Sequence, residues 1–300
     1  MTDARAAFLT RLVDYAGLFP PASLTIGEAV AQYREARGGP HSWMLGRFLC
    51  PASRLGELVA AMEGDTAEVG VILDGPGRGG PWGPAMRDDL ERVATYTGAL
   101  AIATLEARLP AEAPVEAVGA AVPALAAVGL SGADVYLEVP LDVRFETLVP
   151  ETVAAIADAG ARAKVRCGGA TLADFPSPTQ LATFVVACRE SGVPFKATAG
   201  LHHPFPQPDP ATGASMHGFL NLGAAAVLAG SAGLDERAIH DLVSEEDPAM
   251  LSLDEAGVSW RGHTADAEAI AHARAEALVA FGSCSFSEPV LDLVTLGVLD

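Results

Sequence analysis

Six times in succession, a short run of strand-forming residues in this chain is followed by a longer helical segment, at a spacing of about thirty residues. The strand-like runs cover 43–49, 68–74, 99–107, 134–139, 162–167 and 194–199, and the helical segments lie near 53–63, 84–96, 114–128, 150–160, 178–191 and 214–229. This alternation is typical of a parallel sheet covered by helices. It restricts the chain to a small number of α/β architectures.

Two further units would complete a (β/α)8 barrel of the TIM type. YAGLF (15–19) with a helix over 25–36 is expected to be the first unit, and AMLSL (249–253) with a helix over 265–280 the eighth. A segment near 288–298 is expected to be a short extra C-terminal helix. Because no linker divides the chain, we predict a single barrel domain over 1–300. A doubly wound open sheet is the competing architecture, although no GxGxxG follows an early strand.

Composition restricts the partners and the compartment. The chain is 50% hydrophobic and carries a formal net charge of −19, which argues against binding to nucleic acid or to an anionic membrane surface. Its first residues lack the apolar region of a signal peptide. The four cysteines form no CxxC pair, so reduced thiols in a cytoplasmic protein are expected. The oligomeric state stays open.

Lysine is scarce in this chain. Of its 19 basic residues only two are lysine, Lys164 and Lys196, and the other 17 are arginine. Arginine can replace a solvated positive charge, but it cannot supply a neutral amine or a Schiff base. The two lysines are therefore candidates for sites where arginine would fail.

The polar side chains of four consecutive predicted strands share one face, because residues two apart in a strand point the same way. These residues are Thr104, Glu106, Tyr136, Glu138, Lys164, Arg166, Lys196 and Thr198. The opposite face carries Leu105, Leu137, Val139, Val165, Phe195 and Ala197. In a closed barrel the polar set would line the lumen near the C-terminal ends of the strands, where this fold holds its active sites. The alternative is a set of ion pairs that merely fills the barrel.

Arg166, followed by Gly168 and Gly169, is a candidate anion site. Arginine offers a bidentate fork, and glycines let backbone N–H groups approach a phosphate or carboxylate. A tight turn with a surface arginine explains the same residues without a ligand.

His202 and His203 stand side by side in the loop after the strand that carries Lys196. Adjacent histidines can be metal ligands, proton carriers or exposed polar residues. Asp74, Glu106 and Glu138 end successive strands and are the type of array that could hold Mg²⁺.

The lysine-bearing strands resemble the deoxyribose-phosphate-aldolase type of class I aldolase. The run Phe195-Lys196-Ala197-Thr198-Ala199-Gly200 is similar to that family's Lys-Thr-x-Thr-Gly run around its Schiff-base lysine. The resemblance implies one lysine that forms the Schiff base, a second that lowers its pKa, and an acid that shuttles protons. The family's run lies on strand six, whereas this one lies on predicted strand seven. The motif therefore points to Lys196 as the nucleophile and the strand position to Lys164.

Three functions follow from these residues. The first is an aldolase-like lyase for a small anionic carbonyl compound, without a cofactor: Lys196 is the preferred nucleophile, Lys164 the perturbing cation, and Glu138 or Glu106 the proton-transfer group. Arg166 would bind the anionic group, with Gly168, Gly169, Thr198 and Tyr136 around the substrate, and His202 or His203 would relay a proton. The second is a metal-dependent lyase or isomerase, with Zn²⁺, Mg²⁺ or Mn²⁺ held by His202, His203, Glu106 and Glu138. The third is a non-catalytic barrel that binds a small acid.

Overall fold

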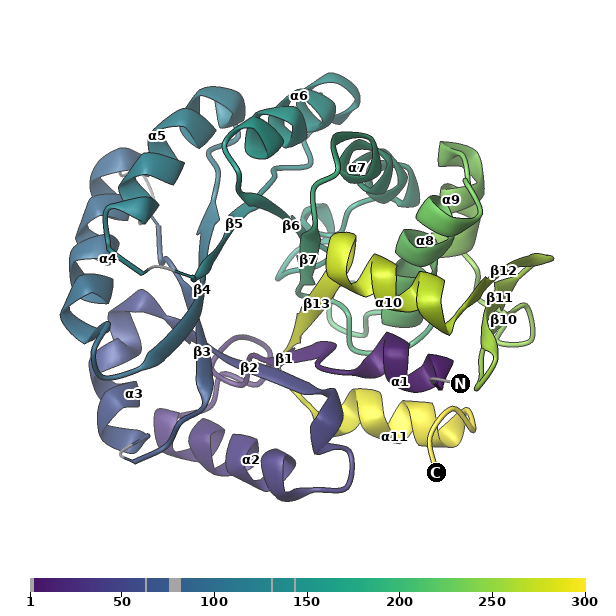
Figure 1. The fold of residues 1–300 in the computed structure, drawn as a ribbon, viewed down its shortest axis with the longest axis horizontal. Coiled ribbons are helices and arrows are strands. Elements are labelled where there is room, and N and C mark those ends of the chain that lie inside the picture. Colours follow the sequence, from purple (N-terminus) through teal and green to yellow (C-terminus); the bar gives the residue numbers. More distant parts are fainter. Residues whose placement is uncertain (1–2, 63, 76–81, 131, 143) are drawn as a thin grey trace.

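Eight parallel strands close into a barrel in the computed structural model, which describes residues 3–62, 64–75, 82–130, 132–142 and 144–300 (Figure 1). The barrel strands are β1 (Val13–Tyr15), β2 (Leu45–Pro51), β3 (Glu68–Ile72), β4 (Ala101–Arg108), β5 (Asp134–Glu138), β6 (Arg162–Arg166), β7 (Phe195–Thr198) and β13 (Leu278–Ser283). Around the barrel they follow the order β1, β13, β7, β6, β5, β4, β3, β2. The predicted (β/α)8 barrel is therefore confirmed, and the open sheet is not.

Helices form the outer ring of the barrel. Those that follow the first seven barrel strands are α2 (Ile26–Gly38), α3 (Leu55–Ala61), α4 (Trp82–Tyr96), α5 (Pro114–Ala126), α6 (Phe145–Asp158), α7 (Pro178–Ser191) and α8 (Phe219–Ser231). All six central βα units lie where the sequence predicts them. The first strand lies two residues earlier than expected, because the chain turns directly after it: the Phe19 N–H donates to the Ala16 carbonyl at 2.9 Å, and Pro20 and Pro21 offer no N–H to a ladder.

The predicted eighth unit is wrong. Leu251–Leu253 forms β10, which pairs antiparallel with β11 (Gly257–Trp260) in a small separate sheet completed by β12 (His263–Asp266). Leu251 and Leu253 are buried while Ser252 is exposed, which is the alternation of a half-covered strand rather than a barrel strand. The eighth barrel strand is β13, and α10 (Ala267–Glu276) ends before it.

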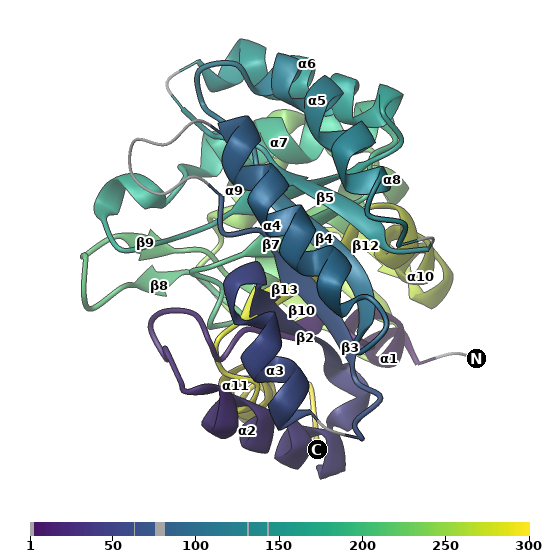
Figure 2. The same cartoon turned by 90° about the vertical axis from the view of Figure 1, so that its left-hand side faces the viewer.

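The C-terminal helix is also reassigned. The helix α11 (Ser287–Thr295) directly follows β13, so it is the helix of the eighth unit rather than an extra element. The additional elements are α1 (Ala4–Leu9) before the barrel and, between α8 and β13, α9 (Glu236–Val243), the small sheet and α10. The hairpin of β8 (Gln207–Pro208) and β9 (Ser215–Met216) projects on the side of the molecule opposite the N-terminus (Figure 2).

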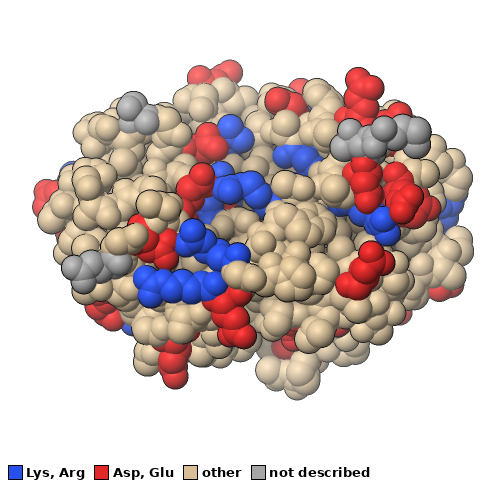
Figure 3. All heavy atoms as spheres, turned by 60° about the horizontal axis from the view of Figure 1, so that its bottom comes forward, with Lys and Arg blue, Asp and Glu red and all other residues tan. Residues whose placement is uncertain are grey.

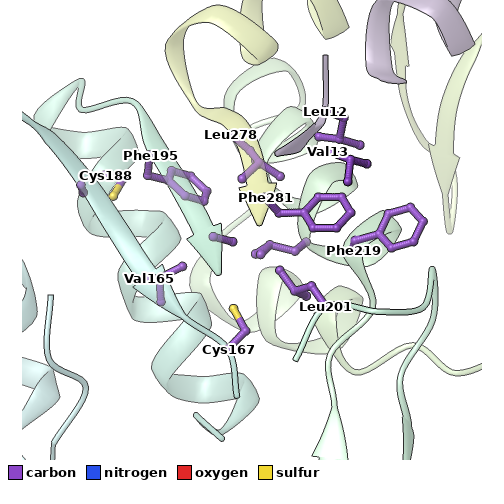
Figure 4. Close-up of a cluster of buried hydrophobic side chains, with 14 of the residues drawn as sticks. Leu12, Val13, Val165, Cys167, Cys188, Phe195, Leu201, Phe219, Leu278 and Phe281 are labelled. Atoms are coloured by element: carbon purple, nitrogen blue, oxygen red, sulfur yellow. The ribbon is translucent and has the colours of Figure 1, made fainter. Parts of the chain in front are cut away.

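An apolar layer lies between the strands and the helices. Val165, Phe195 and Phe281 extend outward from β6, β7 and β13 in this layer (Figure 4), and the Phe281 ring stacks on Phe219 of α8 at 5.0 Å between centroids. Leu105, Leu137, Val139 and Ala197 are also buried, as their strand parity predicts. With the apolar parity packed under the helices, the polar parity is left to face the lumen.

The described residues include no helix that is both long and apolar enough to cross a membrane. All four cysteines are free and buried.

Candidate active site

Ion pairs cross the barrel lumen and bring together the charged residues of four strands. Lys164 on β6 reaches Glu106 on β4, past the intervening β5, with Nζ 2.9 Å from Oε2. Lys196 on β7 contacts the other oxygen of the same carboxylate. Glu106 thus lies between the two lysines, which are register neighbours on adjacent strands. The predicted convergence of these side chains in the lumen is confirmed.

The first group of charges lies at the C-terminal end of the lumen, and we call it the mouth cluster: Arg108, Glu138, Lys164 and Arg166. Arg108 and Arg166 are the last residues of β4 and β6. Arg166 Nε lies 2.9 Å from Glu138 Oε1, Arg108 Nε 3.7 Å from the same atom, and Lys164 Nζ 3.3 Å from Glu138 Oε2. Three cations therefore share one carboxylate, and two of them are partly exposed arginines.

The second group lies deeper, and we call it the inner cluster: Asp14, Arg47, Tyr136 and Lys196. Lys196 Nζ is 2.6 Å from Asp14 Oδ2 and 5.2 Å from the centre of the Tyr136 ring. Asp14 is fully buried, accepts the Arg47 backbone N–H at 2.7 Å and lies 3.7 Å from its guanidinium. Glu106 joins this group to the mouth cluster.

These contacts set the charge states of the site. Burial opposes ionisation of Glu106, but Lys164 and Lys196 outweigh it and lower the pKa of that carboxyl to about 2. Burial likewise opposes ionisation of Glu138, and Lys164 and Arg166 keep its pKa below the usual value. Burial favours the neutral amine at Lys196, yet Asp14 and Glu106 raise the pKa above its ordinary value. The expected lowering of the Lys196 pKa by a neighbouring cation is therefore not found, because two carboxylates contact this amine directly.

Three residues of the two clusters were not among the predicted site residues: Asp14, Arg47 and Arg108. Arg108 continues the parity of Thr104 and Glu106, and that signal would have found it. Asp14 shares the lumen with Lys196 because β1 begins at Val13; a first strand at 15–19 leaves it outside the sheet. Of the expected polar set, Tyr136 and Thr104 are buried in the lumen, and Thr198 ends β7 beside β13.

Gly168 lets the loops after β6 and β7 approach each other closely, and Gly169 lies against Asp174 of its own loop. A Cβ on Gly168 would come within 2.8 Å of the Gly200 Cα, and one on Gly169 within 2.5 Å of the Asp174 Cβ. Ala199 and Gly200 both have positive φ, 58° and 68°. The loops after β6 and β7 thus touch directly, which accounts for these glycines without a bound anion; their part in binding a substrate stays a prediction.

Gly200→Ala is expected to destabilise the protein by about 1–3 kcal/mol, because the new Cβ meets both backbone strain and a steric clash. It would lie 2.8 Å from the Cys167 carbonyl oxygen at a φ of +68°. Gly213→Ala is the matched control, since that glycine also has a positive φ but nothing within 4 Å of its Cβ position. Urea unfolding measures both variants, and equal losses would show that the contact between the loops contributes nothing.

The two histidines face α11 rather than the lumen carboxylates. His202 Nδ1 lies 3.0 Å from Glu288 Oε2, and His203 Nδ1 lies 2.7 Å from Asp292 Oδ2. Across the described ranges, no three His, Cys, Asp or Glu side chains form a group suited to a metal ion. The proposed set of His202, His203, Glu106 and Glu138 is therefore not assembled. Asp74 is also elsewhere: it accepts hydrogen bonds from the Ser53 backbone and hydroxyl at 2.7 and 2.9 Å.

Basic side chains gather on part of the surface in spite of the overall negative charge. On the face drawn in Figure 3, Lys and Arg form several separate groups, the larger of them left of the centre, with Asp and Glu among and around them. Local positive potential can therefore attract small anions to an acidic protein.

Comparison with solved structures bears on the fold. The chain is similar to the deoxyribose phosphate aldolase from Aeropyrum pernix, which was described as having a unique tetrameric structure: the TM-score is 0.55, the sequence identity 12%, and 98% of each chain is covered. No protein-family model and no curated protein sequence matches this chain. The likeness shows that this chain shares its (β/α)8 barrel fold with that aldolase.

Proposed function

We propose that this protein is an aldolase-like lyase that acts on a small anionic carbonyl compound through a lysine Schiff base. The observation that carries the proposal is the pair of buried lysines on one carboxylate, Glu106, in the lumen of an aldolase-type barrel. Ion pairs that only fill the barrel would require neither two lysine amines nor arginines at the C-terminal end of the lumen. A Schiff-base site needs an amine in a largely dry pocket, beside a second cation.

Lys164 is the better nucleophile of the two. Lys196 is held as an ammonium by Asp14 at 2.6 Å and by Glu106, and both carboxylates raise its pKa. Lys164 instead competes with Arg166 and Arg108 for Glu138 and with Lys196 for Glu106. It also lies in the mouth cluster, nearer to where a substrate would enter. Lys196, which the sequence motif predicts to be the nucleophile, then acts as the neighbouring cation.

The chemistry follows from these roles. The Lys164 ammonium gives a proton to a neighbouring carboxylate, and the neutral amine adds to the carbonyl carbon. That proton and one more from the nitrogen pass to the carbonyl oxygen, which leaves as water, and a protonated imine remains. The imine accepts the electron pair of the carbon–carbon bond that breaks, while the hydroxyl on the departing carbon gives its proton to a carboxylate and that fragment leaves as a carbonyl compound. Protonation of the remaining enamine and addition of water then release the second product and the lysine.

Because the pKa values of Glu106 and Glu138 are lowered, both are ionised at neutral pH and can accept a proton only as weak bases. The relay of a proton by His202 stays a prediction, because its Nδ1 pairs with Glu288 on α11 rather than with a lumen carboxylate.

Arg108 and Arg166 support an anionic substrate. The Nε atoms of both arginines contact Glu138 Oε1. The side chains of Arg108 and Arg166 are 67% and 37% exposed, so their terminal N–H groups can face the C-terminal opening of the lumen. A guanidinium fork of this kind matches a carboxylate or phosphate.

Arg166→Gln and Arg108→Gln are each expected to raise KM for the anionic substrate by about 10–100-fold with a smaller change in kcat, because a charge-assisted hydrogen bond is lost from both ground and transition states. Steady-state kinetics measures this. Arg144→Gln is the control, since Arg144 lies just beyond the barrel strands, before α6, and pairs with Asp142 at 3.1 Å rather than with Glu138. An unchanged KM in both variants would show that the two arginines do not bind an anionic group of the substrate.

A further inference from the structure

Three buried donors around the inner cluster have no hydrogen-bond partner in the part of the chain that the structure describes. They are the Nε atoms of Arg47 and Arg274 and the hydroxyl of Tyr136, contributed by β2, α10 and β5. One buried acceptor, Asp14 Oδ2, also lacks a hydrogen bond there, but Lys196 holds it in an ion pair at 2.6 Å. Both guanidinium groups lie within electrostatic reach of Asp14 and Tyr136. Buried donors are nearly always satisfied in folded proteins, so three together need a partner.

These groups lie toward the N-terminal end of the lumen, away from the mouth cluster. Arg274 contacts the carbonyl of Leu278, the first residue of β13, and donates to the Thr10 carbonyl at 3.2 Å, just before β1. Arg47 is the third residue of β2, and its side chain is 15% exposed. A small solute could therefore reach this place from the end opposite the proposed substrate entrance.

The charges here do not balance. Lys196 contacts both Asp14, at 2.6 Å, and Glu106, while Asp14 also lies 3.7 Å from Arg47 and acts on Arg274. The remaining carboxylate of the inner lumen, Glu106, is shared with Lys164. An uncompensated buried cation costs several kcal/mol, so the inner cluster calls for one more negative charge.

We propose that the inner cluster binds a small inorganic anion, chloride, through Arg47 Nε, Arg274 Nε and the Tyr136 hydroxyl. A halide accepts hydrogen bonds from any direction and supplies the missing charge, whereas a water molecule would satisfy the donors but leave the charge excess. The cluster shares Lys196 with the proposed lyase site, but the three donors take no part in the proposed chemistry, and the anion site does not depend on it.

The protonation states of the donors suit this ligand. Burial lowers the pKa of Arg274 to about 10, so the guanidinium is still charged at neutral pH. Burial also raises the pKa of Tyr136, which keeps its phenol as a neutral O–H donor.

Crystals grown or soaked in sodium bromide test the site directly, because bromide replaces chloride and scatters anomalously. We expect an anomalous peak in hydrogen-bond contact with the two Nε atoms and the tyrosine oxygen. A water molecule alone at this position, or no peak, would overturn the proposal.

Thermal unfolding gives an independent readout in solution. At constant ionic strength, replacing gluconate by chloride should raise Tm by about 2–4 °C for each tenfold increase in chloride above its Kd, since only the folded state has the site. Arg47→Met should abolish this dependence. Should that variant fail to fold, Tyr136→Phe, which removes only the hydroxyl, should weaken it.

Arg162→Met is the matched control. Arg162 also stacks near Tyr136, 5.8 Å from the ring centre, but pairs with Asp134 at 3.0 Å and so leaves no unbalanced charge. Its chloride dependence should equal that of the unmodified protein. A dependence that survives in Arg47→Met and Tyr136→Phe as well would place the anion elsewhere and refute this site.

Discussion

Lys164→Arg is expected to abolish turnover, with a loss of at least about 1,000-fold in kcat, although it keeps the positive charge. A guanidinium stays protonated and cannot form an imine. Lys164 is 3% exposed and contacts Glu106 at 2.9 Å, so the larger side chain must fit a confined place. Circular dichroism and the unfolding midpoint should therefore accompany the kinetics. Short oxo-acids and phosphorylated aldehydes are the natural substrates to screen.

Lys196→Arg is the matched control, since it keeps the cation between Asp14 and Glu106 and is expected to retain measurable activity. Borohydride added with an active substrate should trap one covalent adduct, in the unmodified protein and in Lys196→Arg but not in Lys164→Arg. With two lysines in the chain, peptide mapping assigns the adduct directly. An adduct on Lys196 would reverse the two roles. Full turnover in both arginine variants would falsify the Schiff-base mechanism altogether.

Glu106→Gln is expected to destabilise the protein by about 3–5 kcal/mol at neutral pH, because it leaves two buried ammonium groups short of a carboxylate. Its pKa is about 2 in the folded protein, against an ordinary value of 4.5. The stabilisation by ionised Glu106 is therefore fully present above pH 4.5 and is lost as the pH falls toward 2.

Urea unfolding at a series of pH values measures this effect. The unmodified protein should lose stability steeply between pH 4.5 and 2, and Glu106→Gln should show a shallower decline from a lower plateau. Glu151→Gln, at an exposed position in α6, should change the free energy of unfolding by less than about 0.5 kcal/mol. Equal acid limbs in all three proteins would mean that Glu106 is not held ionised by the two lysines.

The six central βα units were predictable because their strands are buried on both faces and alternate regularly with helices. The runs around Leu105, Leu137 and Val165 are short, apolar on one parity and polar on the other, so register and facing follow from the sequence alone. The same parity predicted the convergence of Glu106, Glu138, Lys164 and Lys196.

The two ends of the chain were harder to predict, for physical reasons. Leu251–Leu253 has the β propensity of a barrel strand, and only its pairing with Gly257–Trp260 reveals that it lies outside the barrel. The true eighth strand, Leu278–Ser283, follows an alanine-rich helix with no turn signal between them. The charge state of Lys196 could not be predicted from the sequence either. It depends on Asp14, which lies 182 positions away in the chain and is linked to Lys196 by no local pattern.

The barrel closes by pairing β1, near the N-terminus, with β13, near the C-terminus: Val13 lies opposite Phe281. During synthesis, β1 to β7 can assemble as an open sheet, but β13 must insert between β1 and β7 before the ring closes. Asp14 and Lys196 lie on the two strands that flank this gap, so water leaves their ion pair only at the last step. Closure therefore depends on contacts of very large sequence separation, which form slowly. A nascent or truncated chain that ends before Leu278 presents two unpaired strand edges, the feature through which sheets associate with other chains.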